Sequence, residues 1–109
     1  MSWNKLAAIG DWSTIFPLKT IGIEVHSIDD ESDAPKLLRK LAHSKQFGII
    51  FVVENLYEQV YDVMREFAAQ NLPAIILIPK ISGSEGLGVS IIRETMKKAA
   101  GRDIMAEEE

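Results

Sequence analysis

Along the first eighty positions, short apolar runs alternate with segments in which apolar residues recur at helical spacing. This pattern predicts four strands separated by helices. The apolar runs that predict strands lie at 6–9, 21–28, 49–53 and 74–78. The last two runs are continuously apolar, which is typical of strands covered on both faces, whereas 21–28 alternates as a half-covered strand does. Between these runs, apolar residues recur at helical spacing over 33–42 and 60–68.

A strand followed by a helix, repeated four times, predicts an α/β fold with a parallel sheet, because parallel neighbours need a crossover connection. Right-handed crossovers favour a doubly wound arrangement, for which we expect the strand order 2-1-3-4. The predicted architecture is a four-stranded three-layer sandwich, Rossmann-like or receiver-like, with a C-terminal amphipathic helix after a Gly-rich hinge. Within this single domain we expect a sheet domain at 1–79, a hinge and helix at 80–104, and an acidic tail at 105–109.

The composition of the 109 residues narrows the functional classes. Hydrophobic residues make up 47% and charged residues 26%, which fits a folded domain and not a disordered chain. The net charge is −4, so we expect no basic footprint for nucleic acid. The sequence has no cysteine, which excludes disulfides and thiolate chemistry. No apolar run approaches the roughly 20 residues of a membrane span, so we expect no direct membrane insertion.

Carboxylates follow three of the predicted strands, at the edge where parallel sheets bind ligands. Asp11 follows the first strand, Asp29 and Asp30 the second, and Glu54 the third. One hypothesis is a receiver-like signalling or Mg²⁺-binding domain that uses Asp11, Asp29 and Glu54. A phosphoacceptor site, however, needs an aspartate on the third strand and a lysine on a fifth strand. Here the acid after the third strand is Glu54, and the sequence shows no fifth strand. We therefore favour the interpretation that Asp11 and Glu54 cap helix N-termini, where carboxylates meet unpaired N–H groups.

A glycine-rich loop at 83–90 follows the fourth strand and spaces Gly83, Gly88 and Ser90 as a phosphate-binding loop does. The lysine that should precede the serine is replaced by Val89, and Glu85 adds a negative charge. A nucleotide site is therefore disfavoured. We interpret the loop as a hinge whose freedom comes from Gly83, Gly86 and Gly88.

The predicted last helix is amphipathic. Its apolar stripe includes Leu87, Ile91, Ile92 and Met96, and its other face carries Arg93, Glu94, Lys97 and Lys98. The pattern alone favours a helix that covers its own sheet, because amphipathic helices in small domains usually do so. A hinged helix that presents the stripe to a partner helix is the functional alternative.

The order and spacing of several segments resemble the F subunit of the V/A-type rotary ATPases. These segments are Ile9-Gly10-Asp11, Ile21-Gly22-Ile23, Phe47 to Glu54, Leu72 to Pro79, Gly86-Leu87-Gly88, Ile92-Arg93 and Ala99 to Ile104. The likeness covers about Ile9 to Ile104. Two positions depart from the family pattern: Val53 stands where threonine often precedes the acid, and Lys80 where glycine often follows the proline.

The resemblance implies a central-stalk subunit that has no catalytic residues, cofactor or metal of its own. Such a subunit binds the D subunit, which is the coiled-coil shaft of the rotor. It turns with the shaft inside the catalytic A/B head and helps couple ATP hydrolysis or synthesis to H⁺ or Na⁺ movement. It would lie peripherally on the cytoplasmic side of the membrane. The resemblance favours partner contact by the last helix. The expected anchors are Leu87, Ile91, Ile92 and Met96, and the expected polar rim is Arg93 and Lys97.

Overall fold

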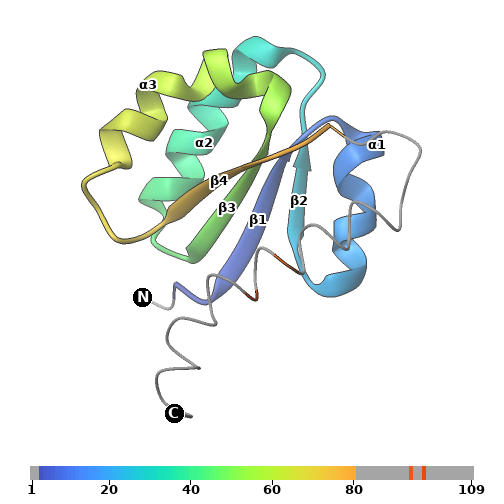
Figure 1. Cartoon of the computed structure of the whole chain (residues 1–109), viewed down its shortest axis with the longest axis horizontal. Helices are drawn as coiled ribbons and strands as arrows, with labels where there is room; N and C mark the ends of the chain where they lie inside the picture. The colour runs from blue at the N-terminus through green and yellow to red at the C-terminus, as the bar shows by residue number, and fades with distance from the viewer. Residues whose placement is uncertain (1–2, 81–93, 95–96, 98–109) are drawn as a thin grey trace.

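One parallel sheet of four strands forms the centre of the computed structural model, which describes residues 3–80, 94 and 97. The strands are β1 (Lys5–Gly10), β2 (Glu24–Ser27), β3 (Phe47–Val53) and β4 (Ala74–Ile78). Their order across the sheet is β2-β1-β3-β4, and every pairing is parallel (Figure 1). The α/β fold and the strand order predicted from the sequence are both confirmed.

Helical segments cover both faces of the sheet in the part of the chain described. They are α1 (Trp12–Ile15), the 3₁₀ segments η1 (Phe16–Ile21), η2 (Glu31–Asp33) and η3 (Glu54–Leu56), and the longer helices α2 (Ala34–His43) and α3 (Tyr57–Phe67). Figure 1 shows α2 and α3 side by side on one face and α1 on the other. The sheet is therefore the middle of three layers, with helical segments above and below it.

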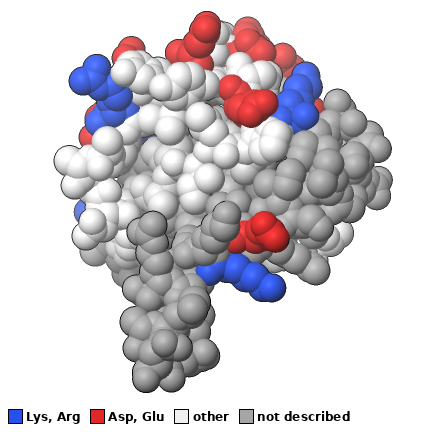
Figure 2. All heavy atoms as spheres, in the orientation of Figure 1, with Lys and Arg blue, Asp and Glu red and all other residues white. Residues whose placement is uncertain are grey.

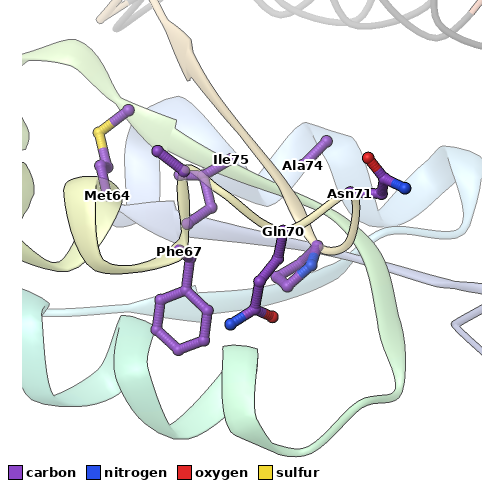
Figure 3. A pocket seen from close by; sticks show the side chains of 8 residues that line it. Met64, Phe67, Gln70, Asn71, Ala74 and Ile75 are labelled. Carbon is purple, nitrogen blue, oxygen red and sulfur yellow. The ribbon is translucent and has the colours of Figure 1, made fainter.

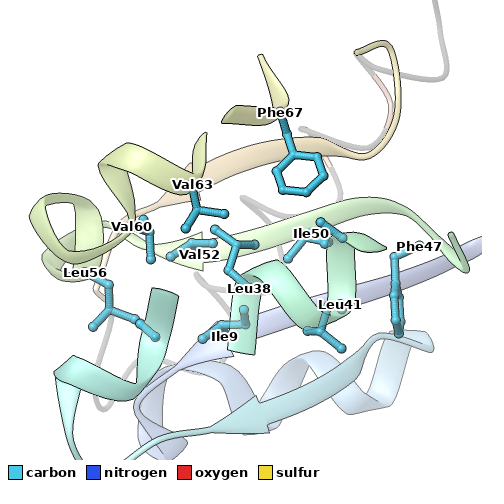
Figure 4. Close-up of a cluster of buried hydrophobic side chains, with 13 residues drawn as sticks. Ile9, Leu38, Leu41, Phe47, Ile50, Val52, Leu56, Val60, Val63 and Phe67 are labelled. Atoms are coloured by element: carbon cyan, nitrogen blue, oxygen red, sulfur yellow. The ribbon is translucent and has the colours of Figure 1, made fainter. Parts of the chain in front are cut away.

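The larger hydrophobic cluster lies between the sheet and helices α2 and α3 (Figure 4). Leu38 and Leu41 of α2 point into it, as do Val60, Val63 and Phe67 of α3. Residues three and four positions apart share one face of a helix, so the apolar spacing in the sequence becomes this buried face.

The central strand β3 is buried on both faces. Ile50 and Val52 join the cluster beneath α2 and α3, while Phe51 and Val53 join a second cluster with Ile15 of α1. Successive side chains of a strand point to opposite faces, so a strand covered twice must be apolar throughout. This explains the uninterrupted apolar run that predicted the strand.

The second strand is shorter than predicted. The alternating run at 21–28 forms a strand only at Glu24–Ser27, because Ile21 ends the 3₁₀ segment η1. Gly22 follows in the left-handed conformation, with φ +88°, and ends that segment. Residues 21–23 of the apolar run therefore lie outside the sheet.

Candidate functional site

The carboxyl edge of the sheet contains the carboxylates that the sequence singled out, and Asp11 is the N-cap of α1. Its Oδ2 accepts hydrogen bonds from the Thr14 amide at 3.2 Å, the Thr14 hydroxyl at 2.8 Å and the Ser13 hydroxyl at 3.0 Å. An unpaired N–H at a helix start is satisfied in this way. The capping role predicted for Asp11 is confirmed.

The environment of Asp11 lowers its pKa. Burial of the carboxyl raises the pKa, but hydrogen bonds from Thr14 and Ser13 stabilise the ionised form, and the positive charge of Lys80 adds to them. Lys80 follows β4, so its charge reaches the end of β1 from two strands away. The ionised form of the Asp11 carboxyl is therefore favoured in the folded protein.

Asp30 and Glu54, two other carboxylates at this edge, have separate local roles. Asp30 caps η2, and its Oδ1 accepts a hydrogen bond from the Ser32 amide at 3.0 Å, which lowers the pKa of Asp30. The capping role predicted for Glu54 is wrong, because Val53 is the N-cap of η3 and no side chain bonds there. Glu54 lies in the first turn of η3 instead, where its negative charge interacts favourably with the positive end of the helix dipole.

Asp11, Asp29 and Glu54 do not come together as a metal site. Within residues 3–80, 94 and 97, no group of three histidine or acidic side chains lies close enough to hold a metal ion. Asn55 donates a hydrogen bond of 3.2 Å to Glu31, which ties η3 to η2 across this edge. The edge is therefore built from caps and cross-links between loops, and the geometry does not support the receiver-like alternative.

The residues expected to contact a partner fall almost entirely outside the described part of the chain. Leu87, Ile91, Ile92, Arg93 and Met96 lie there, and so do the expected hinge residues Gly83, Gly86 and Gly88. Lys97 is described, and it is an exposed helical residue.

An exposed aromatic surface on α3 was not predicted from the sequence. Tyr57 and Tyr61 are each 41% exposed, and their rings meet edge to face with centroids 5.5 Å apart. The Arg65 guanidinium lies 5.7 Å from the centre of the Tyr61 ring. The three residues follow one another at intervals of four, which is the signal in the sequence that places them on one side of a helix.

A pocket of about 330 Å³ lies between the end of α3 and the start of β4 (Figure 3). Met64, Phe67 and Ala68 line it from the α3 side, and Pro73, Ala74 and Ile75 line it from the β4 side. Its polar side chains are Gln70 and Asn71, from the connecting segment. The lining has no charged residue, and its surface is about half apolar and half polar, so it suits an apolar side chain better than an anion or a metal.

No helix in the described part of the chain is long and apolar enough to cross a membrane.

Comparison with known proteins points to one family over most of the chain. The family model for the ATP synthase (F/14-kDa) subunit matches residues 6–96. The V-type ATP synthase F subunit of Fusobacterium nucleatum is 34% identical over 101 residues, which are 93% of this chain and 95% of that protein. The V-type ATP synthase F subunit of Clostridium perfringens is 30% identical over 103 residues, which are 94% of this chain and 97% of that protein. As the resemblance predicted, the chain belongs to the ATP synthase (F/14-kDa) subunit family and is similar throughout to V-type ATP synthase F subunits.

Proposed function

We propose that this chain is a non-catalytic rotor subunit in the central stalk of a V-type ATP synthase or ATPase. The observation that carries the proposal is the family match over residues 6–96, which spans the sheet and continues into the segment predicted as the last helix. The use of the Asp11 carboxylate as a helix cap is consistent with a structural role, since three protein donors already occupy one of its oxygens. Val89 in place of the phosphate-loop lysine further supports a subunit that does not itself bind nucleotide.

In the proposed function the last helix binds the D subunit, the coiled-coil shaft. Its anchors are Leu87, Ile91, Ile92 and Met96, while Arg93 and Lys97 form the polar rim. The glycines of the preceding loop, Gly83, Gly86 and Gly88, allow the helix to reach the shaft. An apolar stripe against a coiled coil is a common way for one helix to recognise another.

The subunit then turns with the shaft and makes transient contacts with the catalytic A/B head. It helps couple ATP hydrolysis or synthesis in that head to the movement of H⁺ or Na⁺ through other subunits. It lies peripherally on the cytoplasmic side of the membrane as part of the soluble sector.

The substitution Ile92→Asp tests the shaft contact. We expect it to weaken binding to the purified shaft by about a hundredfold, because a carboxylate would be buried in an apolar interface. Isothermal titration calorimetry gives the dissociation constant, and circular dichroism checks that the domain stays folded. Glu94→Ala is the matched control, since Glu94 is an exposed helical residue and should leave binding unchanged. Equal affinity of Ile92→Asp and the unchanged protein would overturn the proposed shaft contact.

A further inference from the structure

A second surface of the molecule has the composition of a protein-binding site. We define the α3 edge surface as Tyr57, Tyr61, Met64 and Ala68 together with the adjoining pocket. Successive members of this set are three or four positions apart, so they follow one side of α3. Tyr57 and Tyr61 are among the exposed large hydrophobic residues of the described part of the chain. Tyrosine is enriched among the residues that contribute most to protein interfaces.

The pocket continues the aromatic stripe toward the sheet edge. Met64 belongs to both the stripe and the pocket wall, and it faces Ile75 of β4 across the pocket (Figure 3). β4 is the last strand in the order β2-β1-β3-β4, and four of its five residues are only half-buried. A volume of about 330 Å³ is large enough to receive an apolar side chain of a partner.

Three acidic residues and one basic residue, Arg65, lie beside the stripe, so its charge balance is acidic. Glu58 and Asp62 each follow a tyrosine by one position and are exposed, and exposed Glu54 lies just before the helix. None of these three forms an ion pair within residues 3–80, 94 and 97, whereas Glu66 on another side of α3 pairs with Arg39 at 3.0 Å. In Figure 2 acidic side chains gather along the top of the view, where Figure 1 shows both the turn that leads into α2 and the start of α3.

We propose that the α3 edge surface binds a basic amphipathic helix of a neighbouring subunit. The carboxylates of Glu54, Glu58 and Asp62 attract Lys or Arg side chains. The exposed ring of Tyr57 adds cation–π attraction for the same groups, whereas the Tyr61 ring already faces Arg65 and offers apolar contact. From Tyr57 to Ala68 the stripe spans about 16 Å, which is the length of three turns of a helix. An apolar residue of the partner helix enters the pocket at the Ala68 end, and its basic residues lie at the Tyr57 end, beside Glu54 and Glu58.

Two other occupants fit the surface less well. A second copy of this chain related by a twofold axis would bring the same carboxylates face to face, which is unfavourable. An added β-strand would have only the five residues of β4 to pair with, between Pro73 and Pro79, which have no N–H to donate.

The inference goes beyond the proposed function, because the shaft contact there uses residues 87–97 and not α3. The test uses the full chain assembled in its complete ATP synthase complex, with a photoreactive phenylalanine analogue at position 61. After illumination, mass spectrometry identifies the cross-linked residue of the neighbour. The same analogue at position 59 is the matched control, because Gln59 is exposed on a different side of α3. A third preparation carries the analogue at position 92 and reports on the shaft contact.

We expect position 61 to cross-link to a helix of another subunit that carries Lys or Arg within one turn of the cross-linked residue. Position 59 should cross-link that helix at least tenfold less. Cross-links from position 61 to a second copy, to an acidic segment or to a non-helical segment would overturn the inference. So would the absence of any cross-link there. If position 61 reaches a basic helix and position 92 misses the shaft, the inference stands and the proposed shaft contact fails.

Affinity provides a second measurement, made with the subunit found at position 61. The double substitution Tyr57→Ala and Tyr61→Ala should raise the dissociation constant by about 10- to 100-fold, as loss of interface tyrosines commonly does. Glu58→Gln combined with Asp62→Asn should make binding less sensitive to salt, because fewer charges attract the partner. Unchanged affinity and unchanged salt dependence together would refute the charge-complementary interface.

Discussion

Replacing Gly10 by alanine should destabilise the protein through a steric conflict that can be identified experimentally. A Cβ at Gly10 would overlap Cγ2 of Val53, and it would lie 2.9 Å from Val53 Cβ and 3.3 Å from Ile15 Cγ2. Val53 and Ile15 are fully buried, so neither can turn away into solvent. The main chain of Gly10 also accepts a hydrogen bond from the Ile28 amide at 3.1 Å, which restrains the strand end.

The expected cost follows from the packing around these residues. Overpacking of a close-packed core by one methyl group costs about 1–3 kcal/mol, and we expect about 2–3 kcal/mol here because two neighbours are in conflict. Val53→Ala alone should cost about 2–3 kcal/mol, since it removes two buried methyl groups and leaves a cavity. In the double variant the new methyl group occupies space that Val53 Cγ2 has left. The double cost should therefore fall short of the sum by about 1–2 kcal/mol.

Rescue should be partial, because the conflict with Val53 Cβ at 2.9 Å remains after that substitution. Urea unfolding followed by circular dichroism measures the four free energies of the cycle. A cost of about 2 kcal/mol shifts the urea midpoint by about 1–2 M for a domain of this size.

Gly22→Ala is the matched control for the steric explanation. Gly22 has φ +88° and nothing within 4 Å of an added Cβ, so its substitution should cost about 1–2 kcal/mol through the backbone alone. Val53→Ala should not relieve that cost. If the costs of Gly10→Ala and Val53→Ala add to within about 0.5 kcal/mol, or if Gly10→Ala is neutral, the steric reasoning is wrong.

Three further predictions concern the core, the cap and the surface. Leu38→Ala should lower the free energy of unfolding, measured in urea, by about 3–5 kcal/mol, because this side chain of α2 is fully buried in the larger hydrophobic cluster. A loss under about 1 kcal/mol would contradict that burial. Asp11→Asn keeps a capping oxygen but removes the negative charge. Folding lowers the pKa of Asp11, so its ionised carboxylate stabilises the folded state at pH values above its unfolded pKa of about 3.8. The advantage of Asp11 over Asn should disappear as the pH falls through the lower folded pKa, which unfolding measured at several pH values can check. Arg39→Ala should cost only about 0.5 kcal/mol or less, since its pair with Glu66 is solvent-exposed, and a larger loss would indicate packing by the arginine stem.

The sequence predicted the fold well because each element has a strong local signal. The apolar run of β3 requires two covered faces, and such a strand can only lie inside a layered sheet. The length of β2 was predicted less well, since the run at 21–28 looks uniform in the sequence. What ends it is the positive φ at Gly22, and glycine alone does not reveal whether that conformation is used.

The site was predicted only where the chemistry is local. Asp11 caps the helix that begins at the next residue, so its role depends on neighbours three positions away. Glu54 was misassigned because the sequence does not reveal which residue will be the N-cap of a 3₁₀ segment one turn long. Whether the carboxylates of three separate loops converge depends on loop geometry, which the pattern of apolar residues does not determine.

The aromatic surface on α3 illustrates why helical periodicity can conceal a partner site. A helix that packs on a sheet needs an apolar stripe of roughly 100°, and Val63 and Phe67 already lie in the buried stripe of α3. Tyr57 and Tyr61 widen the apolar face to one side, and Met64 joins the two parts. β4 is an edge strand, so no strand of the described part of the chain lies beyond it on that side, and the described core leaves Tyr57 and Tyr61 exposed. The residues that make α3 easy to predict as a helix therefore include some that the fold itself does not need.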